Sequence, residues 1–517
     1  MHSFVERSDE QTMCGLTDLV SSCLSKASGG HSRTSSAQQP QPFLRASLFT
    51  GIPPTIRFYT KGTKVSKPNK KITNRLTWCH NSLLPIVMRH CLAASHFTIV
   101  DESLFYIGYW GRHLKSSQYR TLKPHQKVNH YPGAFHIGRK DRLWMHIEKQ
   151  QRRLGEHVYD IMPKTYLLPK DYDHMRNYLA ASPSNHVIIK PPASARGTGI
   201  SVTRKVKEIP EKTQLVAQHY VDRPLTINGA KFDLRLYAYV PSLEPLRIYI
   251  YEEGLVRFAS VPYSKCVSTV SNKYMHLTNY SINKLAEQDG VSDSPVPKWR
   301  LTELWKYFEN DGINSAGIRE RIEDVIIKAF IACEKPIRDH MVRHIQHGFI
   351  CHELFGVDIL LDEDLKPWLL EVNISPSLHS GTPLDISVKA PLAKDVLNMA
   401  GIYVPPSPEE MATADYGTRP RNWPKEEEHV QFASIQFVIW KHSPLDEYRR
   451  RGNFRLIFPT ADTAFMQSYF VQPVYANLML QQWQIEQEAC GREDGISRLE
   501  SLCRQWFLRN RESDEEC

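Results

Sequence analysis

Residues 356–377 read GVDILLDEDLKPWLLEVNISPS, which is two apolar runs separated by a short acidic stretch. Apolar runs of this length on either side of charged turn residues predict an antiparallel β-hairpin, here over residues 355–372. With the turn centred on residues 364–365, Leu361 faces Trp368 and Asp358 falls opposite Glu371. Directly paired side chains lie on one face of the ladder, ~5 Å apart.

The polar side chains of this hairpin form a cluster of hard oxygen ligands. Asn373 lies two residues beyond Glu371 and therefore shares its face. Two carboxylates and an amide oxygen suit Mg²⁺ and phosphate oxygens. The alternative is the solvated edge of a hairpin, but Asp358 and Glu371 would repel each other without a cation between them. The pattern therefore predicts a magnesium site at Asp358, Glu371 and Asn373.

A second polar row lies in KFDLRLY, residues 231–237. Because side chains alternate along a strand, Lys231, Asp233 and Arg235 share one face. Such a row is equally consistent with a salt-bridged face exposed to solvent. Beside a metal site it favours phosphoryl transfer, because lysine and arginine hold the negative charge that shifts during that reaction.

A third signal is VIIKPPASARGTGI, residues 187–200. A strand ends in Lys190 and is followed by a loop that contains Gly197 and Gly199. The ammonium group and the backbone N–H groups of such a loop can contact phosphates. The loop lacks the Walker and Rossmann glycine patterns, and by itself it would be interpreted as a β-turn.

The composition bounds the class of protein. A chain of 517 residues exceeds the usual size of one hydrophobic core, so two or three lobes are expected. Its 41% hydrophobic and 23% charged residues are typical of a globular enzyme. The net charge of +9 favours a polyanionic partner, whether nucleic acid, an anionic membrane or an acidic protein. No nucleic-acid-binding module is recognised.

The N-terminal residues and the cysteines indicate a reducing compartment. The chain starts without the basic region and apolar core of a signal peptide, and no run approaches the ~18 apolar residues that span a bilayer. The ten cysteines include no CxxC pair, so reduced thiols are expected rather than disulfides. These features predict a cytosolic or cytoskeletal protein with no membrane contact.

The chain is expected to divide into five parts. Within them, charged amphipathic spacing predicts a helix over 139–154, and a long helix over 315–347 is expected to be interrupted or kinked near Pro336. The run LRIYIYEEGLVRF, residues 246–258, predicts two strands with a hairpin turn at 253–254. The parts are a disordered segment (1–53), an N-terminal lobe (54–154), a central lobe (155–240), a C-terminal lobe with the metal hairpin (241–402), and a Pro-rich linker with a basic helical extension (403–517).

Two further clusters have weaker interpretations. His340, His344 and His347 share a helix face, where a zinc site is far less favoured than a polar helix surface because no catalytic Glu or Cys accompanies them. The cluster Arg449–Arg451, with Arg455, is equally consistent with a solvated basic face and with a site for a polyanion.

Together these segments resemble the tubulin tyrosine ligase-like family over roughly residues 95–402. The resemblance is closest to its glutamylating branch, through HLTNYSINK and the long helix before the metal hairpin. It implies an α/β (α+β) ligase of the ATP-grasp type, with N-terminal, central and C-terminal lobes. The matching motifs, in the family's order, are NHYPGAFHIGRKDRLWMHI (129–147), MPKTYLLP (162–169), IIKPPASARGTGI (188–200), KFDLRLY (231–237), YMHLTNYSINK (274–284) and LLEVNISPSLHS (369–380).

The resemblance implies a role for each matching site residue. Gln218 would lie at the adenine hinge, and the loop with Arg196 would close over the triphosphate. Lys190, Arg235 and Glu371 would be catalytic, while Asp358, Glu371 and Asn373 would hold Mg²⁺. The residues implied to bind ATP are Lys164, Lys190, Arg196, Gly197, Gly199, Gln218, Lys231, Asp233, Arg257 and Asn279.

The resemblance also implies the reaction and its partners. ATP would activate a glutamate γ-carboxylate in an acidic tail, as in tubulin, and the amine of free L-glutamate would then form an isopeptide bond. The expected enzyme is a monomer at microtubules, including those of cilia, axonemes or basal bodies, and residues 420–517 are a candidate for gripping the microtubule. The alternatives are a protein glycylase, a small-molecule ligase of the glutathione-synthetase kind, and a non-catalytic microtubule-binding protein.

Overall fold

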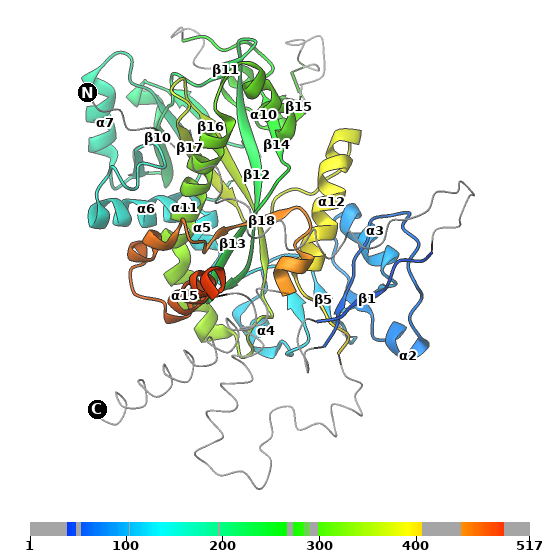
Figure 1. The fold of residues 1–517 in the computed structure, drawn as a ribbon. Coiled ribbons are helices and arrows are strands. Elements are labelled where there is room, and N and C mark those ends of the chain that lie inside the picture. The colour runs from blue at the N-terminus through cyan, green and yellow to red at the C-terminus, as the bar shows by residue number, and fades with distance from the viewer. Residues whose placement is uncertain are drawn as a thin grey trace, which may run out of the picture. The chain divides into compact units, whose positions relative to one another are not determined.

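An antiparallel sheet built around one long strand carries most of the residues considered above (Figure 1). Its central strand, β12 (Ala230–Leu243), is buried along almost its whole length. One edge of β12 pairs with β16 (Glu353–Leu361), which continues into β17 (Pro367–Asn373). The other strands of this sheet in the described chain are β11 (Thr226–Ile227), β13 (Leu246–Tyr251), β14 (Leu255–Phe258), β15 (Lys298–Arg300) and β18 (Phe454–Phe458).

The computed structural model describes most of the chain. Residues Gln41–Leu478 form one unit, to which the following description applies. The second unit comprises Met1–Pro40 and Met479–Cys517. The described residues are 39–47, 53–102, 104–194, 197–265, 272–283, 285–286, 289, 298–405 and 446–490.

The β16–β17 hairpin forms as predicted at the end that carries Asp358 and Glu371 but not at its turn. Leu361 pairs with Pro367, so the expected pairing of Leu361 with Trp368 is wrong by one residue. A β-bulge between Asp358 and Ile359 then adds one residue to β17 and brings Asp358 opposite Glu371. The bulge therefore restores the predicted carboxylate pair.

The hairpin expected over residues 246–258 is absent. β13 and β14 do not pair with each other, because both pair with β12, one after the other along the same edge. The residues between them interrupt what would otherwise be one continuous strand beside β12. β18 extends the sheet beyond β13, and β15 extends it beyond β14.

A second, smaller sheet forms around a small core of its own. Its strand order is β7-β10-β8-β9, and all three pairings are antiparallel. Lys190 is the last residue of β8, as the sequence predicted. The elements are β7 (Thr165–Leu168), α7 (Tyr172–Ala181), β8 (Val187–Lys190), β9 (Ser201–Thr203), η1 (Val206–Glu208) and β10 (Leu215–His219).

A third sheet lies in the N-terminal part and is parallel, in the order β4-β3-β5-β6. A bridge between Val128 and Cys351 joins it to the residues that precede β16. The strands are β3 (Thr77–Cys79), β4 (Thr98–Val100), β5 (Gly108–Tyr109) and β6 (Lys127–Val128), and the helices are α2 (Lys70–Thr73), α3 (Ile86–Ala94) and α4 (Ser116–Thr121).

Part of the N-terminal segment that was expected to be disordered is ordered. β1 (Leu44–Arg45) pairs with β2 (Thr55–Ile56), and Phe43 is buried. Residues 1–38 and 48–52 lie outside the described residues, so the disorder expected there stays a prediction.

Two hydrophobic cores cover the two faces of the large sheet. In one core, Phe232, Leu234 and Leu236 of β12 pack with α11 (Ser315–His344) and α6 (Lys140–Leu154). In the other, Tyr237 and Tyr239 pack with α12 (Pro383–Met399) and α3. Both predicted helices form; α11 runs through Pro336 without interruption, and a kink there stays a prediction. The remaining helices are α5 (Phe135–Gly138), α8 (Lys273–His276), α9 (Tyr280–Asn283) and α10 (Leu301–Asn310).

The stretch that starts at Asp446 is part of the large sheet and its core rather than an extension. β18 is a strand of the large sheet, and Arg247 donates two hydrogen bonds, of 2.9 and 2.7 Å, to the carboxylate of Glu447. The assignment of 403–517 to a linker and extension is therefore wrong for this stretch. Arg450 is also buried, which removes it from a basic surface. Residues 406–445 lie outside the described chain, and the last elements are η3 (Ala464–Tyr469) and α15 (Tyr475–Cys490).

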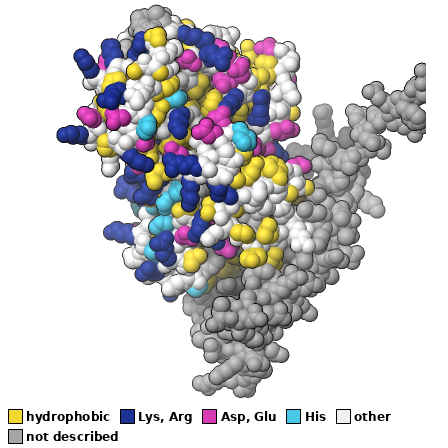
Figure 2. All heavy atoms as spheres, turned by 90° about the vertical axis from the view of Figure 1, so that its left-hand side faces the viewer, with side chains coloured by type: hydrophobic (Ala, Val, Ile, Leu, Met, Phe, Trp, Pro, Cys, Tyr) yellow, Lys and Arg dark blue, Asp and Glu magenta, His cyan; other side chains and the backbone are white. Residues whose placement is uncertain are grey.

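Two further features of the described residues concern the charge of the surface and the length of the helices. Lys and Arg side chains are spread over the face on which α6 and α7 lie, with His side chains among them (Figure 2). Among the described helices, none combines the length and the apolar character needed to cross a bilayer.

Candidate active site

The register of three strands places Arg235, Asp358 and Glu371 in one row across the sheet. Arg235 pairs with Asp358, and Asp358 pairs with Glu371. Arg235 Nε and Nη2 donate to the two carboxylate oxygens of Asp358 at 2.6 and 3.1 Å. The predicted carboxylate pair therefore exists, and a guanidinium group neutralises one of its members.

A second row, one register step along the same face, contains Asp233 and Arg257. Arg257 donates to both Asp233 oxygens at 2.7 and 2.5 Å, and also to Asp358 Oδ2 at 2.8 Å. Thr278 adds a hydrogen bond of 2.7 Å to Asp233. The predicted face of Lys231, Asp233 and Arg235 is therefore salt-bridged, but it is buried rather than exposed to solvent.

These contacts keep Asp358 ionised despite its burial. Burial alone would raise the pKa of Asp358, but the charges of Arg235 and Arg257 outweigh it and hold this pKa well below its usual range. Three guanidinium hydrogen bonds use three of the roughly four acceptor positions of the carboxylate. One position on Asp358 is left for a further ligand.

The remaining predicted metal ligands fit a hard cation. Asn373 pairs with Gly356 and donates to Glu371 Oε1 at 3.1 Å, so the amide lies beside the carboxylate. Two carboxylates and an amide on one face of a hairpin are donors that Mg²⁺ accepts. Glu371, Asn373 and the free position on Asp358 are the groups that would hold the ion.

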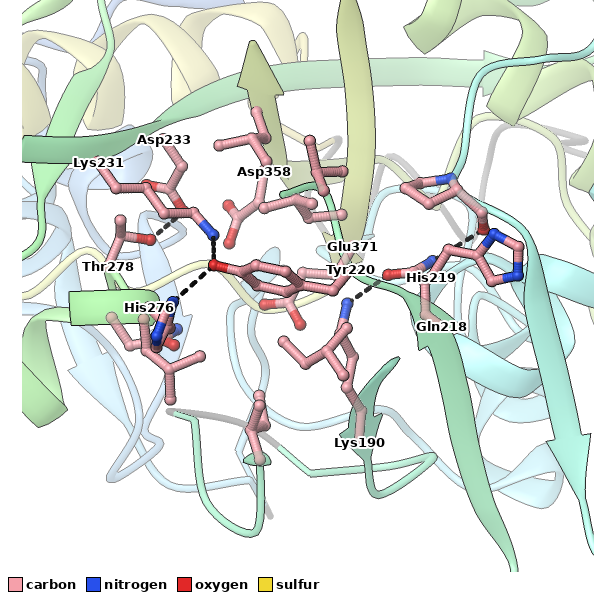
Figure 3. A pocket seen from close by; sticks show the side chains of 18 residues that line it. Lys190, Gln218, His219, Tyr220, Lys231, Asp233, His276, Thr278, Asp358 and Glu371 are labelled. Atoms are coloured by element: carbon pink, nitrogen blue, oxygen red, sulfur yellow. Dashed lines mark hydrogen bonds between the residues drawn. The ribbon is translucent and has the colours of Figure 1, made fainter. Parts of the chain in front are cut away.

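A pocket opens beside these rows and encloses about 660 Å³ of empty space, part of it open to solvent. Lys190, Gln218, Lys231, Asp233, Asp358 and Glu371 all line it (Figure 3). The pocket is lined by residues of the smaller sheet, on β8 and β10, and of the large sheet, on β12, β16 and β17.

Two buried lysines lie on opposite sides of this pocket. Lys190 donates to Gln218 Oε1 at 2.6 Å, and Lys231 donates to the Tyr220 hydroxyl at 3.0 Å. Burial lowers the pKa of Lys190 to about 8, assisted by the positive charge of Lys140. Burial likewise lowers the pKa of Lys231 to about 7. An anion in the pocket would stabilise both ammonium forms.

Gln218 lies at the base of the pocket and holds its surroundings in place. Its amide nitrogen donates to Thr165 Oγ1 at 2.9 Å and to the Pro163 carbonyl at 3.3 Å. Its expected place at the adenine hinge stays a prediction.

The glycine loop borders the pocket through Ile200, whereas Gly197 and Gly199 are not among the lining residues. Gly197 has φ +76°, and a Cβ there would lie 2.4 Å from Ile282 and 3.0 Å from Asn279 Oδ1. Gly199 has φ +72°, and a Cβ would lie 2.9 Å from Pro191. Both positions therefore require glycine, and Asn279 lines the pocket as predicted. Arg196 lies outside the described residues.

One predicted residue lies elsewhere. Lys164 is exposed, and its Nζ lies 5.6 Å from the centroid of the Trp144 ring rather than at the pocket wall. A nucleotide contact from Lys164 therefore stays a prediction.

Lys140 belongs to the site but was missed in the sequence. Its Nζ lies 2.8 Å from Glu371 Oε2 and donates to the Ser194 carbonyl at 3.0 Å. The signal was present, because Lys140 lies three and four residues before the buried Leu143 and Trp144 of α6. A lysine on the apolar stripe of a helix needs a buried anionic partner.

The histidines of α11 do not form a metal site. His340 and His344 ring centroids are 5.9 Å apart, and His340 faces His136 instead of a second ligand on its own helix. A different group, His113, His130 and Glu353, has its ligand atoms close together in the described residues. The two rings stack 3.8 Å apart and nearly parallel, so one ion cannot lie in both ring planes.

The site defines the class of the protein as an ATP-dependent ligase, and sequence comparison gives the family. Residues 117–412 match the tubulin-tyrosine ligase family. This chain belongs to that family.

Curated relatives extend the match beyond this region. A tubulin polyglutamylase of Caenorhabditis elegans is 60% identical, over 99% of this chain and 94% of the relative. A tubulin polyglutamylase of Caenorhabditis briggsae is 59% identical over the same shares. A human tubulin monoglutamylase is 39% identical over 90% of this chain, which spans only 42% of that protein.

Proposed function

We propose that this chain is an ATP-dependent glutamate ligase that attaches free L-glutamate to glutamate side chains in the acidic tails of tubulin. The observation that carries the proposal is the row Arg235–Asp358–Glu371, which borders a pocket lined by two lysines. The names of the curated relatives support glutamate as the donor and tubulin as the acceptor.

ATP would occupy the pocket between the central strands and the large sheet. Lys190 and Lys231 carry lowered pKa values because they are buried, and the triphosphate would supply the negative charge that both lack. The backbone of the glycine loop would contact the phosphates. Arg196, Gln218, Lys164 and Asn279 complete the proposed nucleotide site.

In the first step, an oxygen of the acceptor γ-carboxylate attacks the γ-phosphorus of ATP, and the bond to the β-phosphate oxygen breaks to release ADP. Arg235 lies beside Asp358 in this row and would neutralise charge on the transferred group. Mg²⁺ held by Asp358, Glu371 and Asn373 would polarise the phosphoryl oxygens.

In the second step, the amine of free glutamate attacks the carbonyl carbon of the acyl phosphate. The amine loses a proton, the C–O bond to phosphate breaks, and an isopeptide bond and inorganic phosphate remain. Both steps depend on positioning and charge. The buried salt bridges of Arg257 with Asp233 and Asp358 would supply the rigid framework that this positioning needs.

The surface charge supports an acidic macromolecule as the acceptor. The net charge of +9 and the Lys and Arg side chains on the face of α6 and α7 would attract Glu-rich tails (Figure 2). We propose that the enzyme acts at microtubules as a monomer. Its presence in cilia, axonemes or basal bodies stays a prediction.

Two measurements separate this proposal from its rivals. ATP-dependent incorporation of labelled glutamate and labelled glycine into microtubules is measured in parallel, with Glu371→Gln as the inactive control. Glutamate incorporation that the substitution abolishes is the expected result. Incorporation of glycine alone would make the enzyme a glycylase, and incorporation of neither, with ATP still bound, would favour a non-catalytic protein.

A further inference from the structure

A row of four histidines crosses the helices that lie beside the β16–β17 hairpin. His136 is on α5, His146 is on α6, and His340 and His344 are on the last two turns of α11. His136 Nδ1 lies 3.0 Å from His146 Nε2, and the ring centroids of His136 and His340 are 5.6 Å apart. The centroids of His340 and His344 are 5.9 Å apart, so the four rings form one continuous histidine row. At its far end, Arg120 of α4 lies 3.5 Å from His344 Nδ1.

The histidine row is connected to the candidate active site through the segment that joins α5 to α6. Gly138, two residues after His136, packs so closely on Ile374 that a Cβ would lie 2.6 Å from its Cγ2 atom. Ile374 directly follows β17, and Lys140 lies 2.8 Å from Glu371 on that strand. The row therefore starts beside the end of β17 and extends from it across α11 to α4.

Exposed cations without carboxylate partners surround the histidine row. Arg142 and Lys149 are exposed on α6, and Arg343 is exposed on α11. Within the part of the chain that the structure describes, none of these three side chains forms an ion pair, and Arg343 Nε donates only to the Asp339 carbonyl at 3.0 Å. Figure 2 shows the same mixture, with histidines among lysines and arginines on the face that carries α6.

The carboxylates near the histidine row each have a cation of their own. The pairs are Arg139–Asp141 at 2.8 Å, Arg152–Glu148 at 2.9 Å, Lys335–Asp339 at 2.9 Å and Arg338–Glu334 at 3.1 Å. The charge that remains around the row is therefore positive. Such a surface is complementary to a chain of carboxylates.

The histidine rings add hydrogen-bond donors to these fixed charges. Burial lowers the pKa of His136 and of His146 to about 4, and the positive charge of Arg142 adds to the effect at both rings. The rings are therefore neutral near pH 7, and a neutral imidazole still carries one N–H donor. Carboxylates can accept hydrogen bonds from such donors while the arginines balance their charge.

The spacing of the rings fits an extended peptide. Along the row, successive ring centroids are 5.2, 5.6 and 5.9 Å apart. Side chains on one face of an extended chain recur every ~6.6 Å, which is close to these separations. The row therefore has room for about five residues of an extended chain, with every second side chain directed at it.

We propose that the histidine row, together with Arg142 and Arg343, binds the acidic chain next to the acceptor glutamate and so directs that glutamate to the end of β17. This inference rests on the proposed function, because it assigns the surface that holds the acceptor of that reaction. It commits to an acidic peptide, since a row one ring wide that leads to the hairpin matches a single extended chain.

The first test is direct binding of a fluorescein-labelled peptide of about eight glutamates, which is longer than the row, measured by fluorescence anisotropy without ATP. The double variant Arg142→Gln, Arg343→Gln should weaken binding by about 3- to 30-fold, because two charges that face the peptide are lost. The double variant Lys71→Gln, Arg176→Gln is the matched control. It removes two exposed charges on α2 and α7 and should change the affinity less than about twofold.

A further variant tests the rings themselves. Among the described residues, His340 contacts other rings but makes no side-chain hydrogen bond, so His340→Ala should fold normally. We expect it to weaken peptide binding at least about threefold, whereas His340→Gln, which keeps an N–H donor, should lie closer to the wild type. In the ligase reaction, Arg142→Gln, Arg343→Gln should raise the KM for microtubules and leave the KM for ATP within about twofold of the wild type.

The outcomes separate this inference from the proposed function. Equal peptide affinities for the wild type, the Arg142→Gln, Arg343→Gln variant and the control would overturn the assignment of the surface, even if the wild type transfers glutamate. Tighter binding of a single-stranded oligonucleotide or of phosphatidylserine vesicles than of the peptide would also overturn it. A wild type that transfers no glutamate, but whose peptide binding depends on Arg142 and Arg343, would contradict the proposed function and support the acidic-chain surface.

Discussion

Lys140 and Glu371 form a salt bridge of 2.8 Å between the start of α6 and the β16–β17 hairpin. Lys140 also holds the Ser194 carbonyl, so one ammonium group connects the predicted metal ligand with the loop that precedes Gly197. The pair therefore joins three parts of the site that lie far apart in the sequence. Buried ion pairs of this kind fix geometry more than they add stability.

Removal of Lys140 tests this connection. We expect Lys140→Gln to lower kcat/KM for ATP by about 10- to 100-fold, because Glu371 and the loop lose their common partner. Steady-state kinetics with labelled glutamate measures the change. Lys149→Gln, an exposed lysine on the same helix, is the control. Equal kinetics for the two variants would contradict the positioning role.

The glycine loop makes a second prediction. Gly197→Ala should reduce ATP binding at least about tenfold, because the new Cβ would meet Ile282 at 2.4 Å in addition to the strained φ. Gly229 has nearly the same φ, +75°, but nothing lies within 4 Å of its Cβ position. Gly229→Ala should therefore cost only about 1 kcal/mol of stability and retain ATP binding. Titration of both variants with ATP measures the two affinities. Similar affinities would show that the contact of residue 197 with Ile282 does not affect ATP binding.

The buried Glu353 makes stability depend on pH. Burial raises the pKa of Glu353 to about 8 and lowers the pKa of its partner His130 to about 4. Between about pH 6.5 and 8 the folded state keeps the Glu353 proton that the unfolded state has released. The free energy of unfolding therefore falls as pH rises through this window, and below it the opposite shift of His130 offsets the effect.

Urea unfolding at several pH values checks this sign. Glu353→Gln cannot release the proton, so its free energy of unfolding should rise relative to the wild type by up to ~1.4 kcal/mol per pH unit between 6.5 and 8. Glu148→Gln, on the surface of α6, should follow the wild type. Parallel profiles for wild type and Glu353→Gln would mean that Glu353 is ionised in the folded protein.

The residues after 445 should be required for folding. Arg247 and Glu447 are 1% and 3% exposed, and loss of the carboxylate would leave a buried guanidinium without its counter-charge. Glu447→Gln is expected to cost about 3–5 kcal/mol in urea unfolding. Asp462→Asn, at an exposed position in the same segment, should change stability by less than about 0.5 kcal/mol. A Glu447→Gln variant as stable as the wild type would show that this ion pair is not needed for folding.

The place of β18 in the large sheet also changes how a truncation of the C-terminal residues is interpreted. Removal of residues 420–517 deletes β18 from the large sheet, so weaker microtubule binding after that truncation would not identify a binding segment. Arg450 and Arg455 illustrate why the sequence misled. Arg450 is buried, and Arg455 pairs with Glu323 and Glu252, partners that lie more than 100 residues away.

Local patterns predicted the β16–β17 hairpin and the strand of Lys231 because their periodicity does not depend on distant residues. The predicted pair of Asp358 and Glu371 is confirmed, although the turn differs and a bulge compensates. Side-chain partners from distant segments could not be predicted. Examples are the contact of Lys140 with Glu371 and the pairing of β13 and β14 with the same edge of β12. Their positions depend on tertiary packing, which local spacing does not encode.

The most direct test of the proposed function is mass spectrometry of tubulin after incubation with the enzyme, ATP and free glutamate. The proposal predicts glutamate linked through the γ-carboxylate of glutamate residues in the acidic tails, dependent on ATP and abolished by Glu371→Gln. Unmodified tails in the presence of folded wild-type enzyme that binds ATP, or modification that survives Glu371→Gln, would contradict it.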